Sequence, residues 1–304
     1  MTAVSGVLSE TAFVPKRGQT QSLEWTAQGF VFELRSPDEK LLERARSILA
    51  VRSPAATGAV ARSWTIERAE EPEQWIVSAT SETSSMIPLR AETRDMALLF
   101  VEYDALEWLI HNSPDTITVH AALLSKNGKG VVIAGPSFSG KSTLATALWR
   151  DGWSLMSDDL VFIDTFARTA TPAPRRVSLR FGSKDLIGES AWNEISRTPS
   201  CVETEKGLFF HPHEVSGREK ETRTDLAAIF FLARIDTVIG AAEVRRVNPA
   251  KAAISLLPYA FNIRTLPFIE GLRRVTPLLD KVPAFDIGRG DLEAMVNAVE
   301  VTLG

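Results

Sequence analysis

The sequence contains almost no cysteine and no long apolar run. Cys201 is the single cysteine among 304 residues, so the chain forms neither an internal disulfide nor a cluster of metal-binding thiolates. No uninterrupted apolar stretch reaches the length that crosses a bilayer, and the N-terminus lacks a basic segment followed by an apolar one. We therefore expect a cytoplasmic protein without a membrane partner.

Charge and composition exclude further classes of function. The net charge of -4 gives no overall attraction to nucleic acid, so we expect no nucleic-acid partner. With 44% hydrophobic and 24% charged residues, the chain has the composition of an ordinary globular protein. Its length suffices for one large domain or two modest ones, and no internal repeat or low-complexity segment is present.

One motif carries most of the chemical information. A complete G-x-x-x-x-G-K-[ST] phosphate-binding loop is formed by Gly135-Pro136-Ser137-Phe138-Ser139-Gly140-Lys141-Ser142-Thr143. An apolar, β-branched run ends at Ala134 before it, and a helix-forming run begins at Leu144 after it. This strand–loop–helix context favours a site for ATP, another nucleoside triphosphate or another polyphosphate. The alternative is a glycine-rich connection with an exposed Lys141.

The residue types of the loop define the roles of its members. Gly135 and Gly140 allow backbone angles that turn successive N–H groups toward phosphate oxygens, and the following helix adds its positive end. Lys141 is expected at the β- and γ-phosphates, and the Ser142 hydroxyl at Mg²⁺. We therefore predict ATP and Mg²⁺ as cofactors. The loop residues expected to bind the nucleotide are Gly135, Ser137, Phe138, Ser139, Gly140, Lys141, Ser142 and Thr143.

A pair of carboxylates follows one crossover downstream. Asp158 and Asp159 come directly after a short apolar run, where the strand ends of a parallel sheet meet a nucleotide. One carboxylate at such a strand end serves Mg²⁺, and a second accepts the proton of an attacking hydroxyl. Adjacent strand residues point to opposite faces, so both act together only where the strand bends or ends. The alternative is a polar turn with two solvated aspartates.

Hydrophobic periodicity divides the chain into two parts. Residues 1–115 predict a small α+β module with paired strands and two helices, one starting after Ser36-Pro37 and one over 95–110. The module has no chemical motif, so substrate recognition is assigned to it by elimination. If that is its role, ATP binding survives its deletion; loss of ATP binding would mean that it completes the fold. Residues 116–304 predict a catalytic domain that closes with a strand over 225–232 and helices over 249–257, 268–281 and 291–302.

Several of these motifs together resemble a known family. The strongest are Val119-His120-Ala121-Ala122, the phosphate loop, Gly152-Trp153 and Ser157-Asp158-Asp159. They resemble the catalytic domain of HPr kinase/phosphorylase, and more closely the stand-alone HPr-kinase-related proteins, including those in clusters for lasso and other modified peptides. The resemblance extends over 119–304 through Glu205-Lys206-Gly207, His211-Pro212, Ala260-Phe261-Asn262 and the segment 290–294. It does not cover residues 1–115.

The resemblance implies an α/β, P-loop fold of the HPr-kinase and phosphoenolpyruvate-carboxykinase type, and transfer of phosphate from ATP to a hydroxyl. By this likeness the catalytic residues are Lys141, His120, Asp158 and Asp159, with Ser142 and Asp158 at the metal. His120 corresponds to the family histidine near the transferred phosphate; the alternative is a His packed against a polar pocket. No copy of the glycine-rich Arg-Gly signature follows the aspartates, which leaves a further metal ligand unassigned.

Two basic segments are weaker candidates for substrate contacts. Lys206 is expected in a loop near the site, and Arg176 belongs to a basic group with Arg175, Arg180 and Lys184 that receives an acidic peptide or phosphate, or else forms a solvated edge. His211-Pro212-His213 is expected in an exposed loop without metal.

Three functions remain in view. The first is a kinase acting on a Ser or Thr hydroxyl of a peptide or protein, or on the hydroxyl of a small molecule. The second is an ATP-binding regulator or adaptor that transfers nothing, and the third is an ATP hydrolase coupled to a partner. The intact loop and aspartate pair favour the kinase, and a homo-oligomer is left open.

Overall fold

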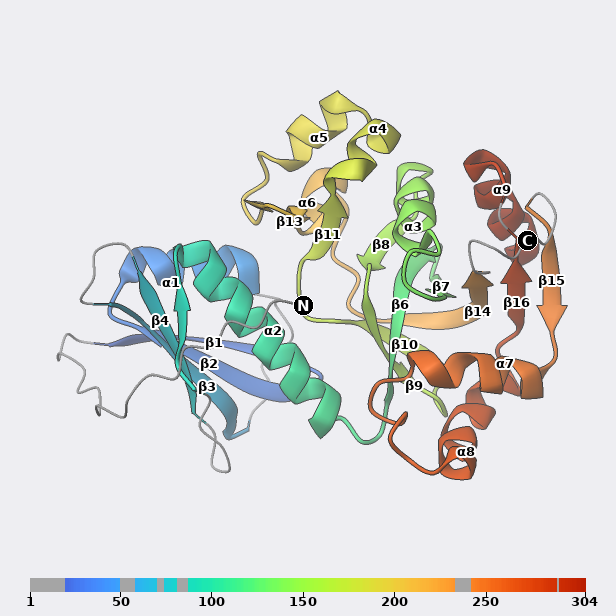
Figure 1. Ribbon diagram of the computed structural model, residues 1–304, viewed down its shortest axis with the longest axis horizontal. Coiled ribbons are helices and arrows are strands. Elements are labelled where there is room, and N and C mark those ends of the chain that lie inside the picture. The colour runs from blue at the N-terminus through green and yellow to red at the C-terminus, as the bar shows by residue number, and fades with distance from the viewer. Residues whose placement is uncertain (1–19, 50–57, 70–73, 81–86, 233–241, 289) are drawn as a thin grey trace.

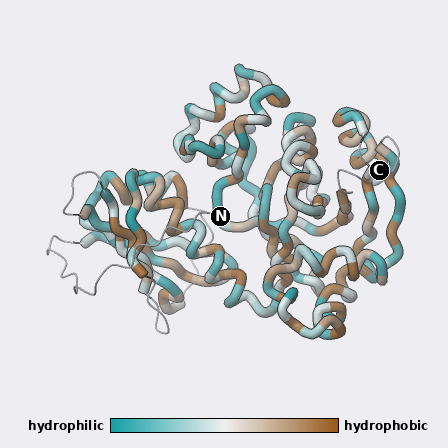
Figure 2. The backbone as a smooth tube through the Cα atoms, in the orientation of Figure 1, coloured by the Kyte–Doolittle hydropathy of each residue, from teal (hydrophilic) through white to brown (hydrophobic). Residues whose placement is uncertain are grey.

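The computed structural model describes residues 20–49, 58–69, 74–80, 87–232, 242–288 and 290–304 (Figure 1). They form a mixed α/β structure with three sheets. No helix among them is both long and apolar enough to span a bilayer. In Figure 2 hydrophobic and hydrophilic residues alternate along the helices that cover the sheets, as expected of helices with one buried face.

The N-terminal unit is a five-stranded sheet covered by two helices. Its strand order is β1-β2-β3-β4-β5, with β2 and β3 parallel and the other neighbours antiparallel. The elements are β1 (Gln21–Ala27), β2 (Phe30–Ser36), α1 (Glu39–Leu49), β3 (Val60–Arg68), β4 (Trp75–Thr80), β5 (Leu89–Ala91) and α2 (Arg94–Asn112). The predicted strands and both predicted helices are confirmed. Leu41, Leu42, Ala45, Ile48 and Leu49 are all buried on the inner face of α1, as their spacing predicts.

The second unit is built on an eight-stranded sheet of order β10-β9-β6-β7-β14-β16-β15, with β8 paired to β6. β7, β14 and β16 are parallel, whereas β6 is antiparallel to β7, β8 and β9. The strands are β6 (Ile117–Lys126), β7 (Lys129–Ala134), β8 (Ser154–Ser157), β9 (Leu160–Asp164), β10 (Thr169–Pro172), β14 (Thr224–Leu232), β15 (Val244–Val247) and β16 (Ala284–Ile287).

Helices cover both faces of this sheet. One buried cluster packs α3 (Lys141–Arg150) and α9 (Leu292–Leu303) against one face. Another packs α7 (Pro249–Leu256), the short 3-10 helix η2 (Leu257–Tyr259) and α8 (Phe268–Leu279) against the other. The predictions of helices over 249–257, 268–281 and 291–302 are thereby confirmed.

A third, small sheet lies between the P-loop helix and the N-terminal unit (Figure 1). It has the order β11-β13-β12 and is antiparallel throughout. Its strands and the surrounding short helices are β11 (Val177–Arg180), η1 (Phe181–Ser183), α4 (Lys184–Ile187), α5 (Glu189–Ile195), β12 (Val202–Thr204), β13 (Gly207–Phe210) and α6 (Pro212–Ser216). Sequence periodicity assigns no element to this segment, because strands of three or four residues are too short to show a period.

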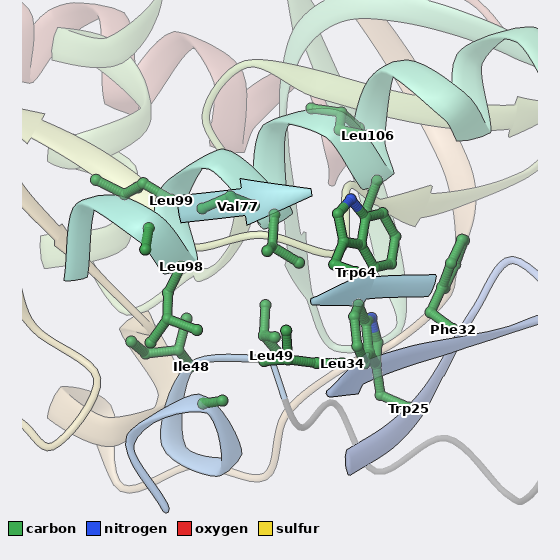
Figure 3. Close-up of a cluster of buried hydrophobic side chains, with 14 of the residues drawn as sticks. Trp25, Phe32, Leu34, Ile48, Leu49, Trp64, Val77, Leu98, Leu99 and Leu106 are labelled. Atoms are coloured by element: carbon green, nitrogen blue, oxygen red, sulfur yellow. The ribbon is translucent and has the colours of Figure 1, made fainter. Parts of the chain in front are cut away.

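The two larger units share one hydrophobic core. The cluster between the N-terminal sheet and its helices is drawn in part in Figure 3, and it includes Trp25, Phe32 and Trp64. Leu160 and Phe162 of β9, together with Ala173, Val202 and Phe209, belong to the same cluster although they follow residue 115. Burial therefore continues across the boundary between the sheets.

Candidate functional site

The segment predicted to bind phosphate lies between a strand and a helix, as its sequence predicts. β7 ends at Ala134, the loop follows, and α3 begins at Lys141. Gly140 has φ 96°, which only glycine adopts without strain, and it forms the N-cap of α3. A side chain at Gly135 would lie 2.9 Å from the Ser139 hydroxyl and 3.1 Å from Leu232. Both glycines are thus required by the backbone.

Lys141 is folded back onto the loop. Its ammonium donates hydrogen bonds to the carbonyls of Gly135 at 2.9 Å and Pro136 at 3.1 Å. Burial lowers the pKa of Lys141, and the positive charge of Arg180 acts in the same direction, while Asp159 raises it. The Ser139 hydroxyl is buried beside it without a hydrogen-bond partner among the described residues. The Lys141 ammonium can move from the two carbonyls to a phosphate, and the Ser139 hydroxyl can donate a hydrogen bond to one.

Phe138 is an exposed aromatic residue in the loop with an unusual backbone angle. Its φ is 65°, in the left-handed region that disfavours residues with a Cβ, and its side chain is 75% exposed. The guanidinium of Arg180 lies 5.6 Å from the centre of the ring. The loop thus carries a strained aromatic residue at the mouth of the site.

The aspartate pair lies at a bend between β8 and β9, two strands that run in the same direction along their common neighbour β6. The expectation of parallel neighbours is wrong, because β8 pairs with the antiparallel strand β6. β7 is also antiparallel to β6, so β7 and β8 run in the same direction and their carboxyl ends share one edge. Strand geometry is interrupted at Asp158 and Asp159, so the bend frees both carboxylates from the alternation of a strand.

The two carboxylates have different surroundings. Asp158 is 8% exposed and accepts hydrogen bonds from the Ser178 backbone N–H at 3.0 Å and hydroxyl at 2.6 Å. Asp159 is 35% exposed, and its Oδ1 lies 3.0 Å from Nδ1 of His120. Asp158 is therefore held from two sides, whereas Asp159 keeps access to solvent.

His120 comes from the first part of β6 and faces the same edge. Burial lowers the pKa of its imidazole, as does Lys141, while Asp159 opposes the shift. The imidazole is therefore neutral at pH 7, with Nδ1–H donating to Asp159. Its Nε2 is then the nitrogen that carries a lone pair.

Arg175 joins the two aspartates, whereas the sequence indicated it only as a member of a basic group. Its Nη2 lies 3.0 Å from Asp159 Oδ2 and 3.6 Å from Asp158 Oδ1. Burial opposes the charge, but the two aspartates outweigh it, and the pKa of the guanidinium is raised. The expectation of a solvated edge is wrong for this residue, because its side chain is 8% exposed.

Arg176 is not placed to contact a substrate. Its guanidinium is buried against the carboxylate of Glu102 on α2, and Nη1 donates to the Ser200 carbonyl at 3.1 Å. The expectation that Arg176 contacts a substrate is therefore wrong. Its side chain forms an ion pair between the two units. Glu102 lies on the otherwise apolar face of α2 with Leu98, Val101 and Ala105, which was the available signal for a buried partner.

One open cleft of about 700 Å³ brings the predicted site residues together. It is lined by His120, Asp158, Asp159, Lys141 and Ser142, and also by Lys206, Tyr103, Phe138, Arg175, Ser178 and Arg180. Lys206 projects from the turn between β12 and β13. Gly207 fixes that turn, since a Cβ there would lie 2.1 Å from the Leu179 carbonyl. Neither Tyr103 nor Ser178 belongs to a sequence motif, so the sequence alone did not indicate that they line the cleft.

His211 differs from its expected place in an exposed loop. It is 6% exposed, and its Nε2 lies 2.9 Å from the carbonyl of Ile48 in α1. Burial lowers the pKa of His211 to about 3. Within the described residues no group of three or more His, Cys, Asp or Glu side chains is placed to hold a metal ion.

Comparison with solved structures gives a distant likeness. No protein-family model matches the chain. Among solved structures, it is similar to the HPr(Ser) kinase/phosphatase from Coxiella burnetii at 14% identity and a TM-score of 0.35, covering 61% of this chain and 93% of that chain. A likeness of this size does not define a common function, which must come from the chemistry of the cleft.

Proposed function

We propose that the protein is an ATP- and Mg²⁺-dependent kinase that transfers the terminal phosphate to the hydroxyl of a Ser or Thr in a peptide or protein. One observation carries the proposal: the phosphate loop, the aspartate pair and His120 line a single cleft. These are the parts that phosphoryl transfer needs, since its catalysis consists of positioning and charge stabilisation.

Nucleotide binding is assigned to the loop and to Lys141. The backbone N–H groups between Gly135 and Gly140 and the N-terminal end of α3 attract phosphate oxygens. On binding, the Lys141 ammonium exchanges the two carbonyls for the β- and γ-phosphates.

Ser142 and Asp158 are assigned to Mg²⁺. Both line a small shared pocket beside the cleft, and a hydroxyl with a carboxylate is a donor set that Mg²⁺ accepts when phosphates and water complete its shell. When bound, the ion neutralises charge between the β- and γ-phosphates.

Asp159 is assigned as the general base that takes the proton of the acceptor hydroxyl. Asp158 already accepts two hydrogen bonds from Ser178, whereas Asp159 is the more exposed carboxylate. The acceptor oxygen forms its bond to the γ-phosphorus as the bond to the β,γ-bridging oxygen breaks, ADP leaves, and the hydroxyl proton passes to Asp159. His120 holds that carboxylate through Nδ1–H.

The open cleft and its rim suit a polypeptide acceptor. Lys206 and Arg180 are exposed cations that line this cleft together with the phosphate loop. Acidic residues that flank an acceptor Ser or Thr would meet these charges.

Mass spectrometry tests the proposal. The purified chain is incubated with Mg-ATP and free serine, HPr or Ser-containing peptides with acidic flanks, beside Lys141→Ala and Asp159→Asn. We expect one phosphate added to an acceptor by the wild type and by neither variant. Mg-ATP binding without transfer to any acceptor would favour the ATP-binding regulator.

A further inference from the structure

Two successive residues of α2, Glu102 and Tyr103, contact the successive arginines Arg176 and Arg175 beside the aspartate pair. Glu102 pairs with Arg176, and both side chains are buried, at 3% and 0% exposure. The ring of the next residue, Tyr103, lies 5.4 Å from the guanidinium carbon of Arg175. The N-terminal unit is thus fixed by a buried ion pair directly beside the arginine that holds both aspartates.

Tyr103 has the surroundings of a ligand contact. It is 48% exposed, although the two residues before it in α2, Val101 and Glu102, are buried. It lines the cleft that contains Asp159, His120 and Lys141. No hydrogen bond of its hydroxyl is found within the described part of the chain, which leaves a free donor on a residue that lines this cleft.

We infer that Tyr103 forms part of the site that holds the phosphoryl group in transfer, so that the N-terminal unit contributes a side chain to the reaction site of the second unit. The inference rests on the proposed kinase function and deepens it. The phenol O–H donates a hydrogen bond to an oxygen of the phosphoryl group in transfer. The face of the ring keeps Arg175 against the aspartates by a cation–π contact.

The two parts of this role can be separated by substitution. Tyr103→Phe keeps the ring over Arg175 and removes only the donor, whereas Tyr103→Ala removes both. The sequence has two tyrosines, and Tyr259 lies in η2 outside the cleft lining. Tyr259→Phe is therefore the matched control, and each tyrosine gives its own signal in protein labelled with 3-fluorotyrosine.

The experiment uses the full chain with Mg-ADP, which fills the phosphate loop, and then fluoroaluminate, which occupies the position of the transferred phosphoryl group. Fluorine NMR follows both tyrosines, and calorimetry gives the Kd of each complex. We expect the Tyr103 resonance to move on addition of fluoroaluminate, and the Tyr259 resonance to stay. Tyr103→Phe should weaken the fluoroaluminate complex about tenfold at unchanged Kd for Mg-ADP, as the loss of one hydrogen bond to a charged group.

The outcomes separate the inference from the proposed function. Suppose that Mg-ADP binds but the Tyr103 resonance does not move on addition of fluoroaluminate, or that Tyr103→Phe leaves the affinity for fluoroaluminate unchanged. The contact of Tyr103 with the transferred phosphoryl group is then overturned, and the nucleotide site stands. If Mg-ADP and Mg-ATP do not bind at all, the kinase proposal and the inference both fail. Equal weakening by Tyr259→Phe would also overturn the assignment, because it would show a general effect on the fold.

Discussion

Asp158 and Asp159 are neighbours in the chain, but the structure gives them different partners. The Ser178 hydroxyl and N–H hold Asp158, and His120 holds Asp159 on the open side of the cleft. Asp159→Asn should therefore lower kcat by 10²- to 10⁴-fold, the usual range for a general base, with the Kd for Mg-ATP nearly unchanged. Asp158→Asn should instead weaken nucleotide binding only when Mg²⁺ is present. Calorimetry with and without Mg²⁺ and transfer assays measure both; identical effects of the two variants would contradict this division.

Phe138 gives a second prediction for a single residue. Its left-handed backbone costs about 1 kcal/mol or more for a residue with a Cβ, and its exposed ring contributes little burial. Phe138→Gly should therefore be about 1 kcal/mol more stable to urea than Phe138→Ala, which keeps the strain but lacks the ring. Because both variants lose the contact with Arg180, their difference isolates the backbone. Equal stability of the two would show that the loop relaxes to another conformation.

At the scale of elements, the sequence pattern predicts a helix or strand where the segment is long enough to show its own hydrophobic periodicity. The strand before the loop, α2 and the three C-terminal helices were predicted for that reason. The small sheet of β11, β12 and β13 was not, because its short strands are defined by pairing with each other, as Arg180 with Gly207. The same holds for the site. Lys141 and the aspartates belong to local motifs and were predicted from the sequence. The burial of Arg175 and its contact with Tyr103 were not, because they depend on segments that only the folded chain brings together.

The contact between α6 and α1 predicts a dependence of stability on pH. His211 donates to the Ile48 carbonyl as a neutral imidazole, and its folded-state pKa of about 3 lies below the ordinary 6.5. The stabilisation is therefore complete above pH 6.5 and is lost as the pH falls toward 3, since the unfolded chain takes up the proton first. At pH 5 the loss amounts to about 2 kcal/mol.

The matched variant for this prediction is His211→Gln, which does not titrate. Between pH 7 and pH 5, the free energy of unfolding of the wild type should fall by about 2 kcal/mol more than that of the variant. Urea unfolding at both pH values measures the difference, in which the titration of other groups cancels. Equal losses in the two proteins would mean that His211 is protonated in the folded state near its ordinary pKa.

At the scale of the whole molecule, the shared core changes the expected behaviour of the second unit in isolation. The prediction from the sequence was that ATP binding survives deletion of residues 1–115 if the module serves recognition alone. In the structure that deletion would expose Leu160, Phe162 and Phe209, which are 5%, 1% and 7% exposed in the full chain. It would also leave Arg176 without Glu102.

These losses are large compared with the stability of a domain. Exposing three large apolar side chains costs about 6 kcal/mol, and the ion pair of Arg176 is lost as well, against a typical total of about 5–15 kcal/mol. A fragment of residues 116–304 should therefore show no cooperative thermal transition and no binding of Mg-ATP by calorimetry. Full-length Glu102→Gln is the control: it should lose about 3 kcal/mol in urea yet fold and bind Mg-ATP, because only the ion pair is broken. A fragment that melts cooperatively and binds Mg-ATP would show that the N-terminal unit is an attachment to a complete kinase, and not a part of its fold.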